Sequence, residues 1–491
     1  MRCAALWSLP RCDAAHIIRF LTFSRLIVVL LSLALLVPVA ALPAAVVTGQ
    51  SADPGQPAAA EQAGEVWAQI LEPTQTFAQS MEPAWIAPTG EWYRVLEQQD
   101  NWLLAFREGD APEAAVWLEL TPAVALQTFP ATAAVPIAPF RAASPEYGLN
   151  IFIWDQPRTT ARDLGKVAGV GFNWQKTLFQ WRLIEPVKSQ PQWGEAERVV
   201  KASNAQGIKV MARVDFQPSW ARADGAHNGP PDDYADYGNF IFALVNHFRP
   251  GAGNGVIDAI ELWNEPNLSR EWGNAVISRE SAADYVRLMC IGHEAAKRAS
   301  ASMTTISAGL SPTGTLNDEA ADDTVYLQWM YDAGARNCFD VLGAHGAGFK
   351  APPWIGPDEL ASNPEWGGHS SFGFRRVEML RDVMVRNGDR AKQVWLLEFG
   401  WTSDPVNQAY AWHRVTEEQK ATYIVEAYRW AAMNWAPWIG VMTLWTLAAP
   451  DWTAAREEYW WSITAPDGTN RPAYDALLRA RRDGYLISVP S

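Results

Sequence analysis

Cysteine is scarce in this chain of 491 residues, which holds four, two of them near its start as Cys3 and Cys12. The other two, Cys290 and Cys338, are too few and too distant from each other for a disulfide scaffold. They could form one bridge in an oxidising compartment, but we expect two buried thiols. The sequence has no paired cysteine and histidine spacing of the kind that holds zinc, so we expect neither a metal nor a cofactor.

Positive charge is also in short supply, because 40 lysines and arginines face 54 aspartates and glutamates, for a formal net charge of −14. Residues 1–41 are net basic, so the rest of the chain is more acidic still. A surface of this sign repels phosphate backbones and anionic headgroups, and no basic stripe offsets it. We therefore expect no nucleic-acid partner.

Long hydrophobic runs are absent except at the N-terminus, where residues 26–47 contain Ser32 as their only polar side chain. Arg19 and Arg25 precede this run, and small residues end its first part at Ala41, as in a secretory signal peptide. The whole stretch is also long enough to span a bilayer. We expect residues 1–47 to direct export, with cleavage favoured over a membrane anchor because Pro38 interrupts the run.

Composition divides the next part of the chain into linkers and a small β-rich module. Residues 48–63 are small and polar with proline and glycine, which is typical of a linker, and residues 121–145 form a second linker rich in proline. Between them, residues 64–120 contain short β-type runs separated by turn residues. Their aromatic pattern resembles bacterial Src-homology-3-like domains, and the resemblance implies contact with the cell wall or another polymer.

Residues 146–491 alternate apolar runs with helical patterns, which predicts one α/β domain. The apolar runs are nearly continuous, as in parallel strands covered on both faces. Eight such strands predict a (β/α)8 barrel, with a doubly wound open sheet as the alternative. The eight runs are 148–154, 171–181, 208–216, 257–265, 304–310, 339–346, 393–401 and 440–447.

Two glutamates follow strands of this barrel at the end where barrel enzymes place their active sites. Glu265 ends the fourth run and Glu398 ends the seventh. His345 ends the sixth run, Trp445 lies near the end of the eighth, and Trp181 follows the second. A pair of carboxyl groups among aromatic side chains suits glycoside hydrolysis, in which one protonates the leaving oxygen and the other attacks or stabilises the anomeric carbon.

The motif Asn264-Glu265-Pro266, combined with Glu398 three strands later, resembles the superfamily of retaining barrel glycoside hydrolases, most closely its family 39-like and family 5-like members. The resemblance implies that Glu265 is the general acid/base and Glu398 the nucleophile. It also makes Asn264 a partner of the sugar 2-hydroxyl. We expect His345, Trp445 and Trp181 to contact the substrate, an oligo- or polysaccharide. We further expect the charge of Glu398 to raise the pKa of Glu265.

One position departs from the family pattern. Many relatives carry a tyrosine two residues after the strand-six histidine, where it bonds the nucleophile, but this chain has Ala347 there. A partner for Glu398 must come from elsewhere, or the barrel is a weak or inactive enzyme that binds carbohydrate or associates with the wall. Arg213 and Asp215 are expected to form a structural ion pair near the third strand.

Overall fold

The computed structural model describes residues 65–87, 92–107, 114–129, 142 and 144–486. The expected leader, the first linker and most of the second linker therefore lie outside the described residues. Across the part that is described, no helix is both long and apolar enough to cross a membrane.

Eight parallel strands form one sheet in the order β12-β11-β10-β9-β8-β15-β14-β13. Its two end strands meet through bridges between Ile306 and Val341 and between Leu310 and Ala344, so the sheet closes on itself. Each of the eight apolar runs overlaps one strand, and the prediction of a (β/α)8 barrel is confirmed. The strands are β8 (Glu146–Asn150), β9 (Trp174–Leu178), β10 (Lys209–Val214), β11 (Ala259–Leu262), β12 (Thr304–Ser307), β13 (Leu342–Ala347), β14 (Val394–Gly400) and β15 (Ile439–Leu444).

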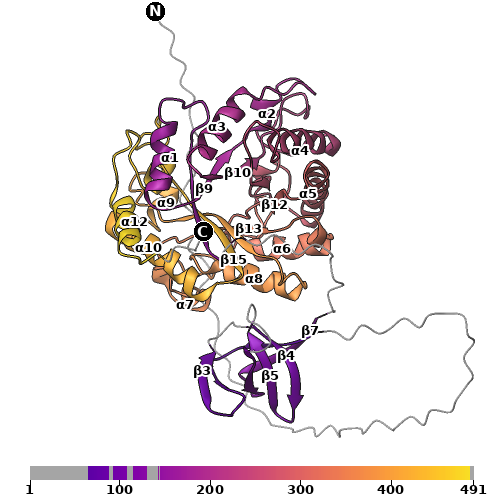
Figure 1. The fold of residues 1–491 in the computed structure, drawn as a ribbon, viewed down its shortest axis with the longest axis vertical. Helices are drawn as coiled ribbons and strands as arrows, with labels where there is room; N and C mark the ends of the chain where they lie inside the picture. The colour runs from indigo at the N-terminus through magenta and orange to yellow at the C-terminus, as the bar shows by residue number, and fades with distance from the viewer. Residues whose placement is uncertain (1–64, 88–91, 108–113, 130–141, 143, 487–491) are drawn as a thin grey trace, which may run out of the picture. The chain divides into compact units, whose positions relative to one another are not determined.

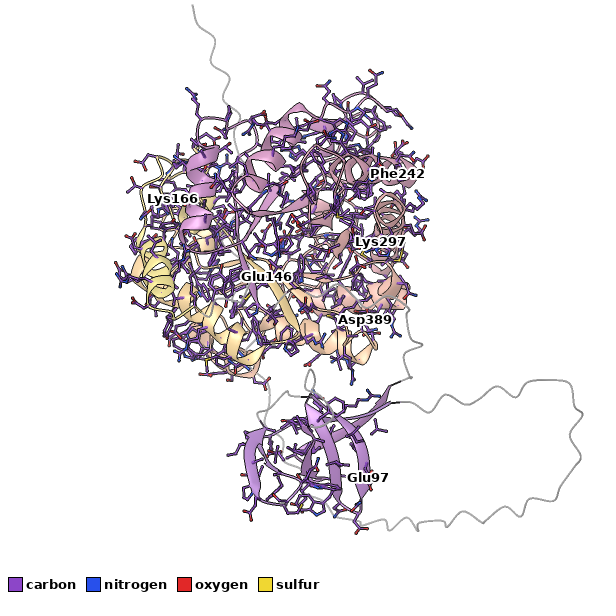
Figure 2. All side chains as sticks on the ribbon, in the orientation of Figure 1. Glu97, Glu146, Lys166, Phe242, Lys297 and Asp389 are labelled. Atoms are coloured by element: carbon purple, nitrogen blue, oxygen red, sulfur yellow. A yellow bond between two sulfur atoms is a disulfide. The ribbon has the colours of Figure 1, made fainter. Side chains whose placement is uncertain are left out.

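Helices surround this barrel, and Figure 1 shows them as an outer ring. Their apolar faces and the outward side chains of the strands share one large core. Lys166, Phe242 and Lys297 mark this ring in Figure 2. The helices are α1 (Thr160–Gly169), α2 (Trp181–Ile184), α3 (Gly194–Asn204), α4 (Tyr234–Phe248), α5 (Arg279–Ala299), α6 (Asp323–Asp332), α7 (Pro357–Ser362), α8 (Arg376–Arg386), α9 (Gln408–Ala411), α10 (Glu417–Asn434), α11 (Glu457–Trp461) and α12 (Pro472–Arg482).

A second, smaller apolar cluster draws one or two side chains from each of six barrel strands, together with Ala142 and Val341, and Trp174 and Trp395 meet edge to face in it at 5.2 Å. Side chains alternate between the two faces of a strand, so the position two residues further along points the same way. From Trp174 this step leads to Lys176, and on the neighbouring strands it leads to Arg213 and Glu261. Three charged side chains therefore lie inside the barrel, one layer above its apolar floor.

The seventh barrel strand breaks this alternation. Ala344 pairs with Leu396 across β13 and β14, but the next residue, His345, pairs with Glu398, so β14 holds one extra residue at this point. Trp395 and Leu397 both belong to the inner cluster, and a regular strand would turn residue 398 toward the helices. The irregularity re-aims Glu398 toward the barrel axis.

An antiparallel sheet forms the N-terminal module, with the strand order β3-β2-β6-β5-β4-β1-β7. Its last strand pairs with β1 along its length and lies inside the segment 121–145, so the sheet extends into the range expected to be a linker. A small core that includes Ala68, Tyr93 and Leu118 supports the sheet. The strands are β1 (Glu65–Ile70), β2 (Thr74–Phe77), β3 (Pro83–Ala87), β4 (Trp92–Gln99), β5 (Trp102–Arg107), β6 (Val116–Glu119) and β7 (Val124–Phe129).

Cys290 and Cys338 form a disulfide, so the expectation of two separate thiols is wrong. The bond joins α5 to the residue that follows the short 3-10 helix Ala335–Asn337, across a sequence separation of 48. The two residues are distant in sequence but adjacent in space, because α5 and this 3-10 helix pack against each other.

Removing this bond by replacing both Cys290 and Cys338 with alanine should lower the free energy of unfolding by about 2–4 kcal/mol, because the unfolded chain regains the freedom of a long closed loop. Urea unfolding of the oxidised protein and the double variant measures the difference. A reducing agent should destabilise the wild type and leave the variant unchanged. Thiol labelling of Cys290 and Cys338 in the native oxidised protein, located by mass spectrometry, would contradict the bond.

Candidate active site

The segment that carries Glu265 leaves the sheet earlier than the sequence suggests, because β11 ends at Leu262. Trp263 and Glu265 both have positive φ, of 83° and 39°. Such a backbone is a true outlier for a bulky side chain and persists only where the surroundings enforce it. Here the Trp263 indole donates to the Glu271 carbonyl at 2.9 Å, and the Glu265 amide donates to the Gly309 carbonyl at 3.1 Å. The candidate acid/base thus stands on a strained but anchored turn.

Glu265 contacts His345 of β13, with Oε1 lying 2.9 Å from Nδ1 of the imidazole. Its other oxygen lies 3.4 Å from the guanidinium of Arg270, a side chain that is 70% exposed. Burial raises the pKa of Glu265 and so does the charge of Glu398, but the hydrogen bond and charge of His345, helped by Arg270, outweigh both. The pKa therefore lies below its usual value. Our expectation of a raised pKa was wrong, because it omitted the imidazole.

Glu398 faces two cationic side chains and an imidazole. Its Oε1 lies 2.9 Å from Nζ of Lys176, 3.6 Å from the guanidinium of Arg213 and 3.9 Å from Nε2 of His345. Burial raises the pKa of Glu398, but Lys176, His345 and Arg213 together lower it to about 2. The lysine and the arginine thus supply the partners that the missing strand-six tyrosine leaves open. They also keep this carboxyl ionised at any ordinary pH.

Lys176 also contacts a second carboxylate, on the side away from Glu398. Its ammonium lies 2.9 Å from Oε2 of Glu261, and both side chains are almost completely buried, at 2% and 0% exposed. Oε1 of Glu261 in turn accepts the Gly309 amide at 3.1 Å. A buried ammonium needs compensating charge to remain protonated. Glu261 and Glu398 together supply that charge, so the lysine is held between two carboxylates.

Arg213 and Asp215 form the expected ion pair at 3.1 Å, and the pair belongs to a larger network. Asn228 donates to Asp215 at 3.5 Å and to Glu271 at 3.0 Å. Burial raises the pKa of Asp215 to about 6 despite the neighbouring arginine. The network fixes the guanidinium that reaches Glu398, so Arg213 is more than a structural partner of Asp215.

Two of the remaining expected contact residues lie at the same end of the barrel. Asn264 is 6% exposed, and among the described residues nothing donates to its Oδ1. This acceptor is buried and has no hydrogen-bond partner among the described residues. Trp445 directly follows β15, is half-buried, and its amide donates to the Phe399 carbonyl beside Glu398 at 2.9 Å. Its ring meets Phe152 edge to face.

Trp181 does not belong to this group, and its expected role as a sugar platform is wrong. The side chain is fully buried, stacks on Phe240 at 5.4 Å and meets Trp220 edge to face. Its indole donates to Glu185 at 2.7 Å. The ring faces are therefore covered by protein, and Trp181 ties α2 to α4.

Sequence reasoning missed Lys176 and Glu261 and underrated Arg213. One signal was available, because a charged residue at an inward position of an otherwise apolar parallel strand must meet an opposite charge inside the barrel. Across the described ranges, no group of three or more histidine, cysteine, aspartate or glutamate side chains is arranged to hold a metal ion.

Comparison with solved structures supports the fold. The chain is similar to a family 39 glycoside hydrolase from the gut symbiont Bacteroides cellulosilyticus WH2, with a TM-score of 0.51 and 17% identity over 86% of this chain and 78% of that one. It is also similar to GH5_18 from Streptomyces cattleya, solved with GlcNAc, with a TM-score of 0.50 and 15% identity over 71% and 82% of the two chains. The resemblance seen in the motifs therefore extends to the barrel.

No protein-family model and no curated protein matches the sequence. At these identities the two solved structures establish a shared fold. The chemistry must therefore be argued from the residues of this chain.

Replacing Lys176 with methionine should destabilise the protein at pH 7 by about 3–5 kcal/mol, because Glu261 and Glu398 lose their shared buried counter-charge. The pH dependence should also reverse. In the wild type, the lowered pKa of Glu398 means that stability is lost as pH falls from about 4.5 toward 2. In the variant the folded carboxyl should have a pKa above its unfolded value of about 4.5, so stability should instead rise as pH falls from 7 toward 4.5.

Urea unfolding at pH 7, pH 4.5 and about pH 3 measures both effects. The matched control is Lys201→Met, which removes an exposed lysine that pairs with Glu197 at 2.7 Å. An exposed pair contributes little, so this control should change stability by less than about 1 kcal/mol. Equal losses in the two variants would contradict the buried triad.

Proposed function

We propose that this protein is an exported retaining glycoside hydrolase that cleaves β-linked O-glycosidic bonds of an oligo- or polysaccharide. The observation that carries the proposal is the contrast between two glutamates on either side of one imidazole at the C-terminal end of a (β/α)8 barrel. One carboxyl is held ionised by two fixed cations, and the other shares a hydrogen bond with a titratable histidine. Such a contrast is how acid/base and nucleophile roles are divided.

In the first step, Glu398 attacks the anomeric carbon as that carbon loses its bond to the leaving oxygen. The leaving oxygen takes a proton from Glu265. The resting pKa of Glu265 is low, so Glu265 must take up this proton before it acts as the acid, and His345 Nδ1 lies at hydrogen-bond distance to deliver it. Asn264 Oδ1 accepts from the sugar 2-hydroxyl, and Trp445 offers the ring a flat apolar surface.

In the second step, Glu265 removes a proton from water, the water oxygen bonds to the anomeric carbon, and the ester bond to Glu398 breaks. The electron pair returns to the Glu398 carboxylate. Lys176 and Arg213 stabilise that returning charge, so they make Glu398 a better leaving group at some cost to its strength as a nucleophile. The first step is therefore the slower one on substrates with poor leaving groups.

Export is supported by two separate features. The basic residues before an apolar run at the N-terminus are typical of a secretory signal. The disulfide between Cys290 and Cys338 is a bond that persists in oxidising compartments.

The two glutamates can be distinguished by azide rescue. Glu398→Ala should lower turnover of an activated aryl β-glycoside by about four orders of magnitude, and added azide should yield a glycosyl azide of inverted configuration. Glu265→Ala should still form the glycosyl-enzyme with a good leaving group, and azide should then give the retained product. NMR of the product anomers measures both.

Swapped stereochemistry would mean that the two roles are reversed. Wild-type rates in either variant, on a panel of aryl glycosides and polysaccharides, would end the glycosidase proposal. The matched control is Glu457→Gln, which alters a carboxyl of α11 that accepts the Trp461 indole at 2.6 Å and has no part in the proposed steps.

The acid limb of kcat/KM provides a separate test, because protonation of the nucleophile abolishes attack. With a pKa of about 2 for Glu398, the wild-type limb should lie well below pH 4.5. Lys176→Met removes the first of the cationic causes of this low pKa, so the limb should move up by more than one pH unit. An unshifted limb in the pH–rate profile would contradict the role of the lysine.

A further inference from the structure

An exposed tryptophan stands on the loop that follows β14. Trp412 comes directly after α9 and is 45% exposed. Within the described part of the chain, Trp354 and Trp412 are the two tryptophans that expose this much of their side chains. A single exposed apolar side chain needs no explanation by itself. Two features distinguish Trp412, namely the frame of aromatic rings that surrounds it and its place on the barrel.

The frame consists of aromatic rings. The indole lies 4.9 Å from the ring of Phe372, 6.0 Å from that of Phe349 at an interplanar angle of 30°, and 4.7 Å from that of His413. Gly367, with φ of 97°, lets the loop come close, because a Cβ there would lie 3.0 Å from the indole. Contacts from several sides hold the ring in one orientation while much of it stays open to solvent.

The frame is anchored at the mouth of the barrel. The Gly348 amide donates to the Gly400 carbonyl at 2.8 Å, which ties the residue after β13 to the end of β14. Phe349 comes next and has a φ of 51°, which is strained for an aromatic residue. Phe349 thus follows the strand that carries His345, at a point that is tied to the strand that carries Glu398. Trp412 contacts Phe349 and is one side chain further out.

Helix α9, which directly precedes Trp412, carries a tyrosine that is affected by the charge of the candidate acid/base. Burial and then Glu457 raise the pKa of Tyr410 to about 12, and the charges of Arg270 and Glu265 also act on this side chain. Tyr410 is two residues before Trp412, so the loop has one residue within electrostatic reach of Glu265 and another that presents an open indole.

We propose that Trp412 is a stacking platform for a pyranose ring outside the pair of sugars joined by the cleaved bond. This inference rests on the proposed glycosidase function and names the substrate class, a chain of several sugar units. The apolar C–H face of a pyranose covers an indole well, and a ring held in advance by Phe349 and Phe372 loses little freedom on binding. Phe349 lies between β13, which carries His345, and the ring of Trp412, so the platform stands one aromatic side chain away from that strand.

Binding of pentasaccharides to a protein that cannot turn them over tests the platform. In a Glu398→Gln background, titration calorimetry with cellopentaose, mannopentaose, xylopentaose and chitopentaose identifies the chain that binds. Trp412→Ala should then raise its Kd about tenfold, which corresponds to 1.4 kcal/mol. Trp412→Phe should raise it less, and the effect of Trp412→Ala should be smaller for the matching disaccharide.

Trp354→Ala is the matched control, because Trp354 is 44% exposed and lies on the loop after β13, but its ring faces Tyr423 of the outer helix α10. This variant should bind the pentasaccharide as the background does. Equal losses for Trp354→Ala and Trp412→Ala, no loss for Trp412→Ala, or no binding of any of the four pentasaccharides would overturn the platform.

The outcome distinguishes failure of the platform from failure of the proposed glycosidase function. If hydrolysis depends on Glu265 and Glu398 but Trp412→Ala leaves pentasaccharide binding unchanged, the platform is wrong and the glycosidase function stands. Absence of hydrolysis by the wild type, combined with binding that depends on Trp412, defeats the glycosidase proposal and leaves a carbohydrate-binding barrel with this platform.

Discussion

A single buried ammonium organises the centre of this barrel. Lys176 is 2% exposed and lies 2.9 Å from a carboxylate on each side, Glu261 and Glu398. Taking three charges out of water costs several kcal/mol per ion and is offset only when the geometry is good and the remaining lone pairs are satisfied. The register of β9, β11 and β14 therefore has to be held closely. The floor of apolar side chains below, with Trp174 against Trp395, provides that rigidity.

The two candidate catalytic glutamates differ because their surroundings differ, although both are mostly buried and lie near the C-terminal end of a barrel strand. Glu398 is enclosed by fixed cations whose own positions are set by Glu261 and by the Asp215 network. Glu265 stands on a strained turn with one imidazole and one exposed guanidinium beside it. Both environments lower the pKa of the carboxyl, and the one around Glu398 lowers it to about 2. This difference supports the division of roles that we propose.

Tryptophan is used in three ways in this fold, and exposure separates them. Trp174 and Trp395 fill the barrel floor, while Trp181 joins two outer helices through stacking and a hydrogen bond. Trp445 and Trp412 keep part of their rings open at the end of the strands that carry the glutamates. An indole can pack, donate a hydrogen bond or present a flat face, and the neighbours decide which of these it does.

The sequence by itself determined the barrel and the two glutamates, because both depend on local pattern. Continuous apolar runs between helical stretches identified the eight strands, and Glu265 and Glu398 stood out as carboxylates after such runs. Tertiary structure alone decided the rest. The features that it decided join residues far apart in sequence. They are the extra residue in β14 that turns Glu398 inward, the cations around Glu398, the imidazole that lowers the pKa of Glu265, the burial of Trp181 and the Cys290–Cys338 bond. Charge balance and packing are set by neighbours in space, so they cannot be predicted from the periodicity of the sequence.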